Sequence, residues 1–141
     1  MIFLDSDTLS YYFSGNTKIY DRISEKINIG EKIALTAINK YEILKGLRWR
    51  KSVKKEALFN DFLKNISVVS IDDNVLNLAA DIYADLRNKG ITIGDADILI
   101  AAIVIKNNGI LISNNTEHYE GIKGLNLENW FYPHFPSILT P

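Results

Sequence analysis

The sequence predicts an α/β domain with a central, mainly parallel sheet flanked by helices, and two observations support this fold class. Short apolar runs of strand length alternate with longer segments of helical periodicity, a pattern typical of parallel sheets connected by helices. Polar side chains directly follow several of these runs, as expected where strands end at one edge of a sheet. With 141 residues, 47% of them apolar, and no repeat or flexible linker, the chain is expected to form one domain over residues 1–141.

The expected elements follow from the apolar runs. Strands are predicted at residues 2–4, 33–36, 66–71 and 110–112, with a short fifth at about 125–127. Helices are predicted at about 16–27, 37–48, 55–65, 73–88 and 95–106. Thr36 is suited to cap the start of the helix over 37–48, and Gly90 follows the end of the helix over 73–88.

The composition excludes several kinds of site. The chain has no cysteine, so it has no disulfide, thiolate metal site or cysteine nucleophile, and its two histidines lack zinc-ligand spacing. No run approaches the roughly 18 apolar residues of a membrane span, and no basic region precedes an apolar run at the N-terminus. A cytoplasmic protein without membrane contact is expected. The net charge of -1 does not itself indicate nucleic-acid binding.

Two carboxylates stand at the start of the helix over 95–106. Its apolar residues surround nearly the whole circumference, which is typical of a buried helix. Asp95 and Asp97 therefore lie at the N-terminal end of a buried helix, where free N–H groups and the helix dipole favour negative charge. Asp95 is suited to be the N-cap. Asp97 lies two residues further in and needs a partner, for which a metal ion is one candidate.

Two more acids have both a structural and a functional interpretation. Asp5 directly follows a buried strand, where it either caps a helix or turn or serves as a ligand for a hard divalent cation. Glu42 is either a solvated helix residue or part of the partly apolar face that includes Gly46. A glycine in a helix interior costs about 1 kcal/mol relative to alanine, which indicates that some group approaches this face closely.

The segment over 45–55 carries six basic residues and no acidic one. One interpretation is a surface that binds RNA phosphates, with an aromatic ring available to stack on a base. The other is a solvated surface with one anchoring tryptophan. The candidate RNA-binding residues are Lys45, Arg48, Trp49, Arg50 and Lys51.

One family resemblance rests on the start of the chain. The segment Asp5–Thr8 (DSDT) resembles the DxDxT loop of haloacid-dehalogenase-type phosphatases, and Gly94–Asp95 resembles the start of their later metal-binding motif. Two departures count against this alternative. The position of that motif's second aspartate is Leu99, and no convincing lysine motif lies between Ser70 and Gly94.

A second resemblance covers nearly the whole chain, in the order and spacing of the family. Four segments together resemble the PIN-domain ribonucleases, and within them the VapC-type toxins of toxin–antitoxin pairs. They are LDSD (4–7), YEILKGL (41–47), IGDADILIAA (93–102) and ISNNT (112–116), with GL (124–125) and Trp130 downstream. The resemblance implies a PIN-like three-layer sandwich with helices on both faces of the sheet.

The resemblance also implies roles for individual acids. Asp5 and Asp97 are expected to be the principal ligands of Mg²⁺ or Mn²⁺, and Glu42 is expected to hold the ion or a bound water. Asp95 is either a cap or an auxiliary metal-binding acid. Asp7 stands in place of the usual asparagine.

One expected catalytic position departs from the family. Asn115 stands where many relatives carry a fourth aspartate, and its amide can bind a water or a phosphate oxygen without supplying charge. The extra charge of Asp7 is expected to offset part of this loss.

The implied activity is endonucleolytic cleavage of RNA by a metal-activated water, which needs no protein nucleophile. The resemblance further implies a homodimer and a small VapB-like antitoxin that covers the site. The aromatic segment over 130–136 packs either at such a surface or on its own domain. A non-catalytic PIN-like binding module is the alternative, favoured by the replaced fourth acid.

Overall fold

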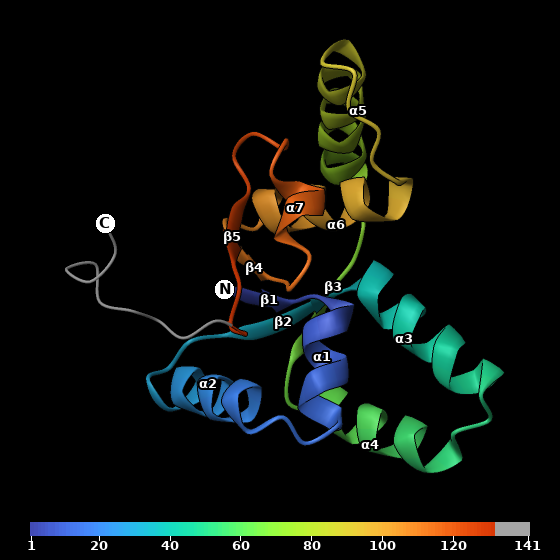
Figure 1. Cartoon of the computed structure of the whole chain (residues 1–141), viewed down its shortest axis with the longest axis vertical. Helices are drawn as coiled ribbons and strands as arrows, with labels where there is room; N and C mark the ends of the chain where they lie inside the picture. The colour runs from blue at the N-terminus through green and yellow to red at the C-terminus, as the bar shows by residue number, and fades with distance from the viewer. Residues whose placement is uncertain (132–141) are drawn as a thin grey trace.

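The computed structural model describes residues 1–131, and its centre is a five-stranded sheet in which all four strand pairs are parallel (Figure 1). The strands are β1 (Ile2–Leu4), β2 (Ile33–Thr36), β3 (Ser67–Val69), β4 (Ile110–Ile112) and β5 (Asn126–Glu128). Their order is β3-β2-β1-β4-β5, so the chain first winds outward from β1 on one side and then returns to the other. Sheets of this kind bind ligands beyond the carboxyl ends of the strands, where the winding reverses.

Seven helices occur in the described part of the chain: α1 (Ser6–Phe13), α2 (Thr17–Asn28), α3 (Ala37–Trp49), α4 (Val53–Leu63), α5 (Asp73–Asn88), α6 (Asp95–Lys106) and α7 (Thr116–Tyr119). Five of them were predicted, with bounds that differ by two residues at most. As predicted, Thr36 caps α3, since its hydroxyl accepts from the Asn39 N–H at 3.1 Å. Gly90 has a φ of +72° beyond the end of α5, a conformation that suits glycine.

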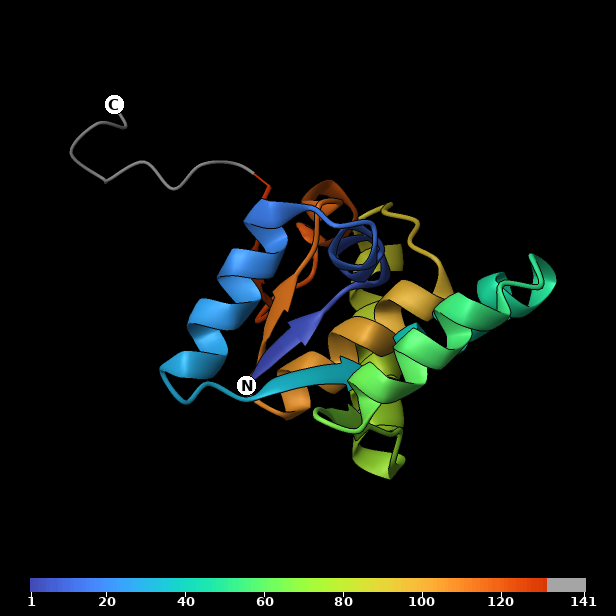
Figure 2. The same cartoon turned by 90° about the horizontal axis from the view of Figure 1, so that it is seen from below.

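The sheet separates two apolar cores because successive strand residues point to opposite faces. Phe3 and Leu111 point into the core formed with α5 and α6. Ile2 and Leu4 point into the core formed with α1, α2 and α4. Helices therefore cover both faces (Figure 2), which confirms the three-layer sandwich.

Helix α6 runs through the first core and positions the acids at its start. Five consecutive residues, from Ile100 to Val104, are fully buried, as the apolar circumference predicted. The prediction that Asp95 caps this helix is wrong. Gly94 is the N-cap, with an extended backbone whose carbonyl accepts from the Ile98 N–H at 3.2 Å, and no side chain caps the helix. Asp95 is instead the first helical residue.

Only the first two residues of the aromatic segment over 130–136 belong to the described part of the chain. Trp130 is buried in the second core, and the Phe131 ring lies edge-on to Tyr11 at a centroid distance of 4.2 Å. These two residues therefore pack on their own domain, and the rest of the segment lies outside the described residues. Among the described helices, none is both long enough and apolar enough to cross a membrane.

Candidate active site

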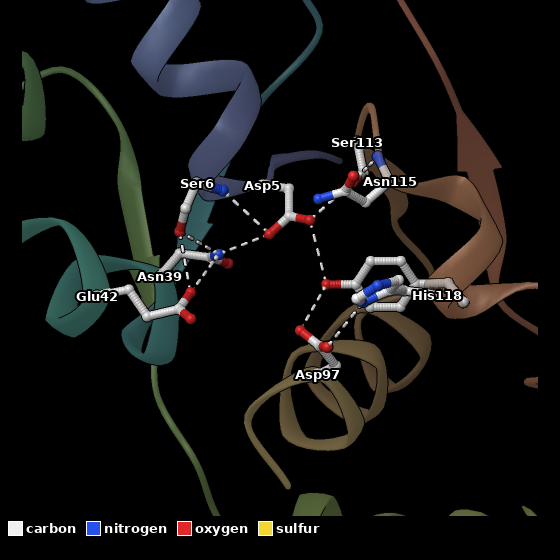
Figure 3. A network of polar contacts seen from close by, with 9 residues as sticks. Asp5, Ser6, Asn39, Glu42, Asp97, Ser113, Asn115 and His118 are labelled. Atoms are coloured by element: carbon white, nitrogen blue, oxygen red, sulfur yellow. Dashed lines mark hydrogen bonds and ion pairs between the residues drawn. The ribbon is translucent and has the colours of Figure 1, made fainter. Parts of the chain in front are cut away.

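The three acids predicted as the site come together at the carboxyl ends of the central strands (Figure 3). Asp5 follows β1 directly, Glu42 lies on α3 after β2, and Asp97 lies in the first turn of α6. Each comes from a different element, and a continuous set of hydrogen bonds joins all three. Parallel strands bring these segments together because their carboxyl ends meet at one edge of the sheet.

Asp5 lies at the centre of the network and is 7% exposed. Its backbone N–H donates to the Ile112 carbonyl at 2.9 Å, which holds the end of β1 against β4. Its Oδ1 accepts from the Ser6 N–H at 3.0 Å and from the Asn39 amide at 2.9 Å. Its Oδ2 accepts from the Ser113 hydroxyl at 2.8 Å and the Tyr119 hydroxyl at 3.1 Å. Asp5 thus caps α1 and anchors the site at once.

Glu42 joins the network through its neighbours on α1 and α3. The Ser6 hydroxyl donates to Glu42 Oε1 at 3.0 Å, and the Asn39 amide lies 3.4 Å from the same oxygen. Asn39 itself is completely buried, and its Oδ1 accepts from the Thr36 hydroxyl at 2.7 Å. The orientation of Glu42 therefore depends on the buried Asn39 amide, which is held by Thr36, the N-cap of α3.

Asp97 reaches Asp5 through one aromatic side chain. The Tyr119 hydroxyl lies 3.2 Å from Asp97 Oδ1, and His118 Nδ1 lies 3.5 Å from Asp97 Oδ2. Tyr119 is buried, whereas the His118 side chain is largely exposed. Both residues belong to the four-residue helix α7, which follows β4.

Burial, together with the clustered charges, shifts the pKa values of the site. Burial raises the pKa of Glu42, and repulsion from Asp5 and Asp97 raises it further, against the lowering effect of the Ser6 hydrogen bond. Burial also raises the pKa of Tyr119 far above its ordinary value, and both aspartates add to the shift. The Tyr119 hydroxyl therefore stays protonated and acts as a donor at any physiological pH.

The family of the chain follows from comparison with known proteins. The model of the PIN domain family matches residues 2–122, which is most of the chain. The chain belongs to the PIN domain family. The prediction made from the four sequence segments is confirmed, and the phosphatase alternative is wrong.

Relatives of this PIN domain include several named ribonucleases. It is 26% identical to ribonuclease VapC2 of Rickettsia felis, over 90% of this chain and 96% of that protein. It is 30% identical to ribonuclease VapC1 of Methanocaldococcus jannaschii, over 67% of this chain and 68% of that protein. It is 25% identical to the tRNA(fMet)-specific endonuclease VapC of Salmonella typhimurium, over 86% of this chain and 98% of that protein. The PIN domain is thus similar to VapC ribonucleases over nearly its full length.

Solved structures show the same fold. The structure of VapBC2 from Rickettsia felis bound to a fragment of promoter DNA matches with a TM-score of 0.84 and 25% identity, covering 92% of this chain and 99% of that chain. The structure of FitAcB from Neisseria gonorrhoeae matches with a TM-score of 0.82 and 21% identity, covering 94% of this chain and 100% of that chain. The second likeness, at its lower identity, concerns the fold alone.

The donor set of the PIN domain fits a hydrated divalent ion. Within residues 1–131, no three acidic or histidine side chains lie close enough together to hold one ion directly. Mg²⁺ usually keeps several waters and takes one or two carboxylates from the protein. No lysine or arginine in this part of the chain forms an ion pair with Asp5, Glu42 or Asp97. Clustered carboxylates without such a partner favour capture of a cation.

The other predicted polar residues lie around the three acids. Asp7 faces the loop after β4, where its carboxylate accepts from the Asn114 N–H at 2.9 Å. Asn115 is exposed, and its backbone N–H donates to the Ser113 hydroxyl at 3.0 Å. Asp95 is exposed at the start of α6. None of these three side chains hydrogen-bonds to Asp5, Glu42 or Asp97 in the described structure.

A groove of about 310 Å³ begins at Glu42 and lies between α1, α3 and α4. Arg50 and Lys55 line it together with Phe13 and other residues of these helices. Gly46 also lines the groove, and a Cβ on it would lie 3.3 Å from Nη2 of Arg50. The group that approaches the glycine closely is therefore the Arg50 guanidinium, folded back along its own helix.

The other basic candidates are placed differently. Arg48 pairs with Glu56 at 3.0 Å, and both line a separate hollow with Lys51. The Lys45 ammonium lies 5.2 Å from the centroid of the Tyr41 ring. Trp49 is 83% exposed, so its ring is free to contact a ligand. Of the five predicted RNA-binding residues, Arg50 is the one that lines the groove beside Glu42.

Sequence reasoning missed several residues of the network, among them Asn39 and Tyr119. The signal for Asn39 was its position three residues after the Thr36 cap and three before Glu42, on one side of α3. Tyr119 lies in a helix too short for periodicity to reveal. Its signal was a large aromatic residue close to the ISNNT segment, and sequence alone did not tell it apart from an ordinary core residue.

Proposed function

We propose that this PIN domain is a VapC-type toxin, an endoribonuclease that cleaves RNA phosphodiesters with a metal-activated water. The observation that carries the proposal is the single hydrogen-bonded network that joins Asp5, Glu42 and Asp97 from three separate elements. The named VapC ribonucleases among its relatives support the same activity. Hydrolysis by an activated water needs no protein nucleophile.

Each acid has a proposed role. Asp5 and Asp97 hold Mg²⁺ or Mn²⁺, and Glu42 holds the ion or a bound water. When bound, the ion neutralises charge that develops on the phosphate and makes hydroxide available near neutral pH. Asn39 orients Asp5 and Glu42 together, because its amide contacts both carboxylates. Asn115 is exposed beside them and offers its amide to a water or a phosphate oxygen.

RNA is proposed to approach along the groove that begins at Glu42. Arg50 lies in this groove and is suited to contact a phosphate beside the scissile bond. Lys45, Arg48 and Lys51 add sequence-independent attraction, and the exposed Trp49 ring offers a stacking surface. Asp95 stays a candidate auxiliary ligand at the edge of the site.

The proposed partner is a small VapB-like antitoxin that blocks the site until it is removed. Similar structures from Rickettsia felis and Salmonella typhimurium are VapBC assemblies bound to DNA, which supports a paired partner here. A homodimer and a cytoplasmic location are further parts of this proposal.

Cleavage of total RNA by the purified, antitoxin-free protein tests the function. We expect defined fragments with MgCl₂ or MnCl₂, none with EDTA, and a loss of at least about 100-fold in Asp5→Asn and Asp97→Asn, the scale of removing one charge-stabilising group. The matched control is Asp81→Asn, an exposed aspartate on α5. Fragments that persist in EDTA or in both site variants would disprove the assignment.

One observation favours a second candidate, a PIN-like module that binds without cleaving. Position 115 carries an amide where the family resemblance implies a fourth acid, and this side chain forms no capping hydrogen bond with α7. Binding of RNA or of the antitoxin with no cleavage by the metal-loaded protein, on any RNA supplied, favours this candidate.

A further inference from the structure

Four hydrogen-bond donors contact the carboxylate of Asp5 in this structure. Two donors, from Ser6 and Asn39, contact Oδ1, and two more, from Ser113 and Tyr119, contact Oδ2, at 2.8–3.1 Å. A carboxylate offers about four lone-pair sites, so these donors fill all of them while the Tyr119 proton points to Asp5. A cation that takes Asp5 as a ligand in that state must displace one of them.

Three of the four donors are held in place by other contacts. The Ser6 N–H is backbone at the start of α1, and the Asn39 amide is fixed by Thr36 through its own oxygen at 2.7 Å. The Ser113 hydroxyl accepts from the Asn115 N–H at 3.0 Å. Each of these donors is thus locked by the backbone or by a second hydrogen bond away from the acids.

The fourth donor differs from the others. The Tyr119 hydroxyl contacts only two groups in the described structure, Asp5 at 3.1 Å and Asp97 at 3.2 Å. A hydroxyl has one proton, so it donates to one carboxylate at a time and turns a lone pair toward the other. It is the single donor that lies between the two acids proposed to hold the ion.

We propose that the Tyr119 hydroxyl competes with the metal ion, because it occupies the place between Asp5 and Asp97 in the metal-free protein. This inference rests on the proposed function, since it takes both aspartates as metal ligands. The hydroxyl partly neutralises two neighbouring carboxylates and must release at least one of them when a cation binds both. Tyr119 thereby stabilises the metal-free state and lowers the affinity for the ion.

The opposite role makes the opposite prediction. If Tyr119 only oriented the two carboxylates for the ion, then removal of its hydroxyl would weaken metal binding. If it competes, removal frees a lone pair on Asp5, leaves the two charges less compensated, and tightens binding. The direction of the change in affinity therefore decides between the two roles.

Calorimetric titration of MnCl₂ and MgCl₂ into the purified protein measures this direction. We expect Tyr119→Phe to bind about tenfold tighter than the wild type, which corresponds to about 1.4 kcal/mol. Tyr83→Phe, at a half-exposed tyrosine on α5, is the matched control and should bind like the wild type. Asp97→Asn should lose the binding, which shows that the titrated ion is at this site.

The outcomes separate this inference from the proposed function. Wild-type binding with equal or weaker binding by Tyr119→Phe overturns the competitor role and leaves the metal site standing. No binding by either protein overturns both. If Tyr119→Phe does not fold, wild-type crystals soaked in MnCl₂ give the answer. With manganese at Asp5 and Asp97, a hydroxyl that keeps both contacts overturns the inference, and one that has left either contact supports it.

Discussion

The amide of Asn39 donates to Asp5 Oδ1 over 2.9 Å and to the Ser6 hydroxyl over 2.9 Å. Asn39 lies on α3, whereas Asp5 and Ser6 form the junction between β1 and α1. One completely buried side chain therefore fixes the distance between two segments of the site that are more than 30 residues apart in the sequence. Glu42 lies one turn further along α3, so its position depends on the same contact.

Asn39→Ala should destabilise the protein and impair the site together. The change leaves the Thr36 hydroxyl without its acceptor and removes one donor from Asp5, so we expect the free energy of unfolding to fall by about 2 kcal/mol. Urea unfolding followed by circular dichroism measures this loss. Asn60→Ala on the exposed side of α4 is the matched control. Equal stability of the two variants would contradict the structural role of Asn39.

A divalent ion should stabilise the folded protein through Asp5 and Asp97. Because the unfolded chain has no preformed site, an ion at about 100 times its Kd should add about 2.7 kcal/mol to the free energy of unfolding. We expect MnCl₂, added after EDTA treatment, to raise the Tm of the wild type and to leave the Tm of Asp97→Asn unchanged. Thermal unfolding measures both values. A shift of equal size in Asp97→Asn would place the ion elsewhere.

The fold was predictable because several separate apolar segments of the sequence each indicate the same arrangement. The apolar runs at β1, β2 and β4 and the wholly apolar circumference of α6 each point to buried elements, and together they permit few topologies. The short helices were not predictable. Helix α7 has four residues, fewer than two turns, so no periodicity can reveal it. Helix α1 depends on one cap, Asp5, whose capping and metal-binding interpretations were not separable and are both compatible with the structure.

The site was predictable as a set of acids but not as a network. Asp5, Glu42 and Asp97 carry a signal in their position after strands or at a helix start. Asn39 and Tyr119 carry only weak signals in their spacing, because their roles depend on which distant groups they contact, 34 and 114 residues away at Asp5. The sequence also favoured Asp95 as a cap, whereas Gly94, with an extended backbone and no side chain, is the residue that caps the start of α6.

The substitution Gly46→Ala should raise the stability of the protein and weaken its binding of RNA. Gly46→Ala improves helix propensity by about 1 kcal/mol, and the Arg50 guanidinium at 3.3 Å from the new Cβ is flexible enough to move away. We therefore expect higher stability in urea and weaker RNA binding by fluorescence anisotropy, because Arg50 no longer lies along the groove.

Arg50→Ala tests the same contact directly. It should weaken binding about equally for different RNA sequences and reduce the slope of log affinity against log salt by about one. Lys89→Ala, at a lysine paired with Asp85 on the far end of α5, is the control. If Arg50→Ala and Lys89→Ala bind RNA equally well, the groove is not the RNA path.

Asp7 should make the stability of the protein fall as the pH rises. Burial raises the pKa of Asp7 in the folded protein, and the nearby Asp5 carboxylate raises it further, against hydrogen bonds from Asn114 and Thr8 that lower it. The folded state therefore binds this proton more readily than the unfolded chain does. The contribution of Asp7 is greatest below its ordinary pKa of about 4 and decreases as the pH passes the folded value.

The measurement is the difference in unfolding free energy between the wild type and Asp7→Asn, taken by urea unfolding from about pH 3.5 to 7. We expect this difference to become less favourable to the wild type as the pH rises. Asp85→Asn should show the opposite sign, since a hydrogen bond from Lys89 lowers the pKa of Asp85 and its contribution is lost as the pH falls. This surface pair is screened by solvent, so its slope should be small. A difference for Asp7→Asn that stays constant or rises with pH would show that Asp7 is not held in a desolvated, acid-rich setting beside the site.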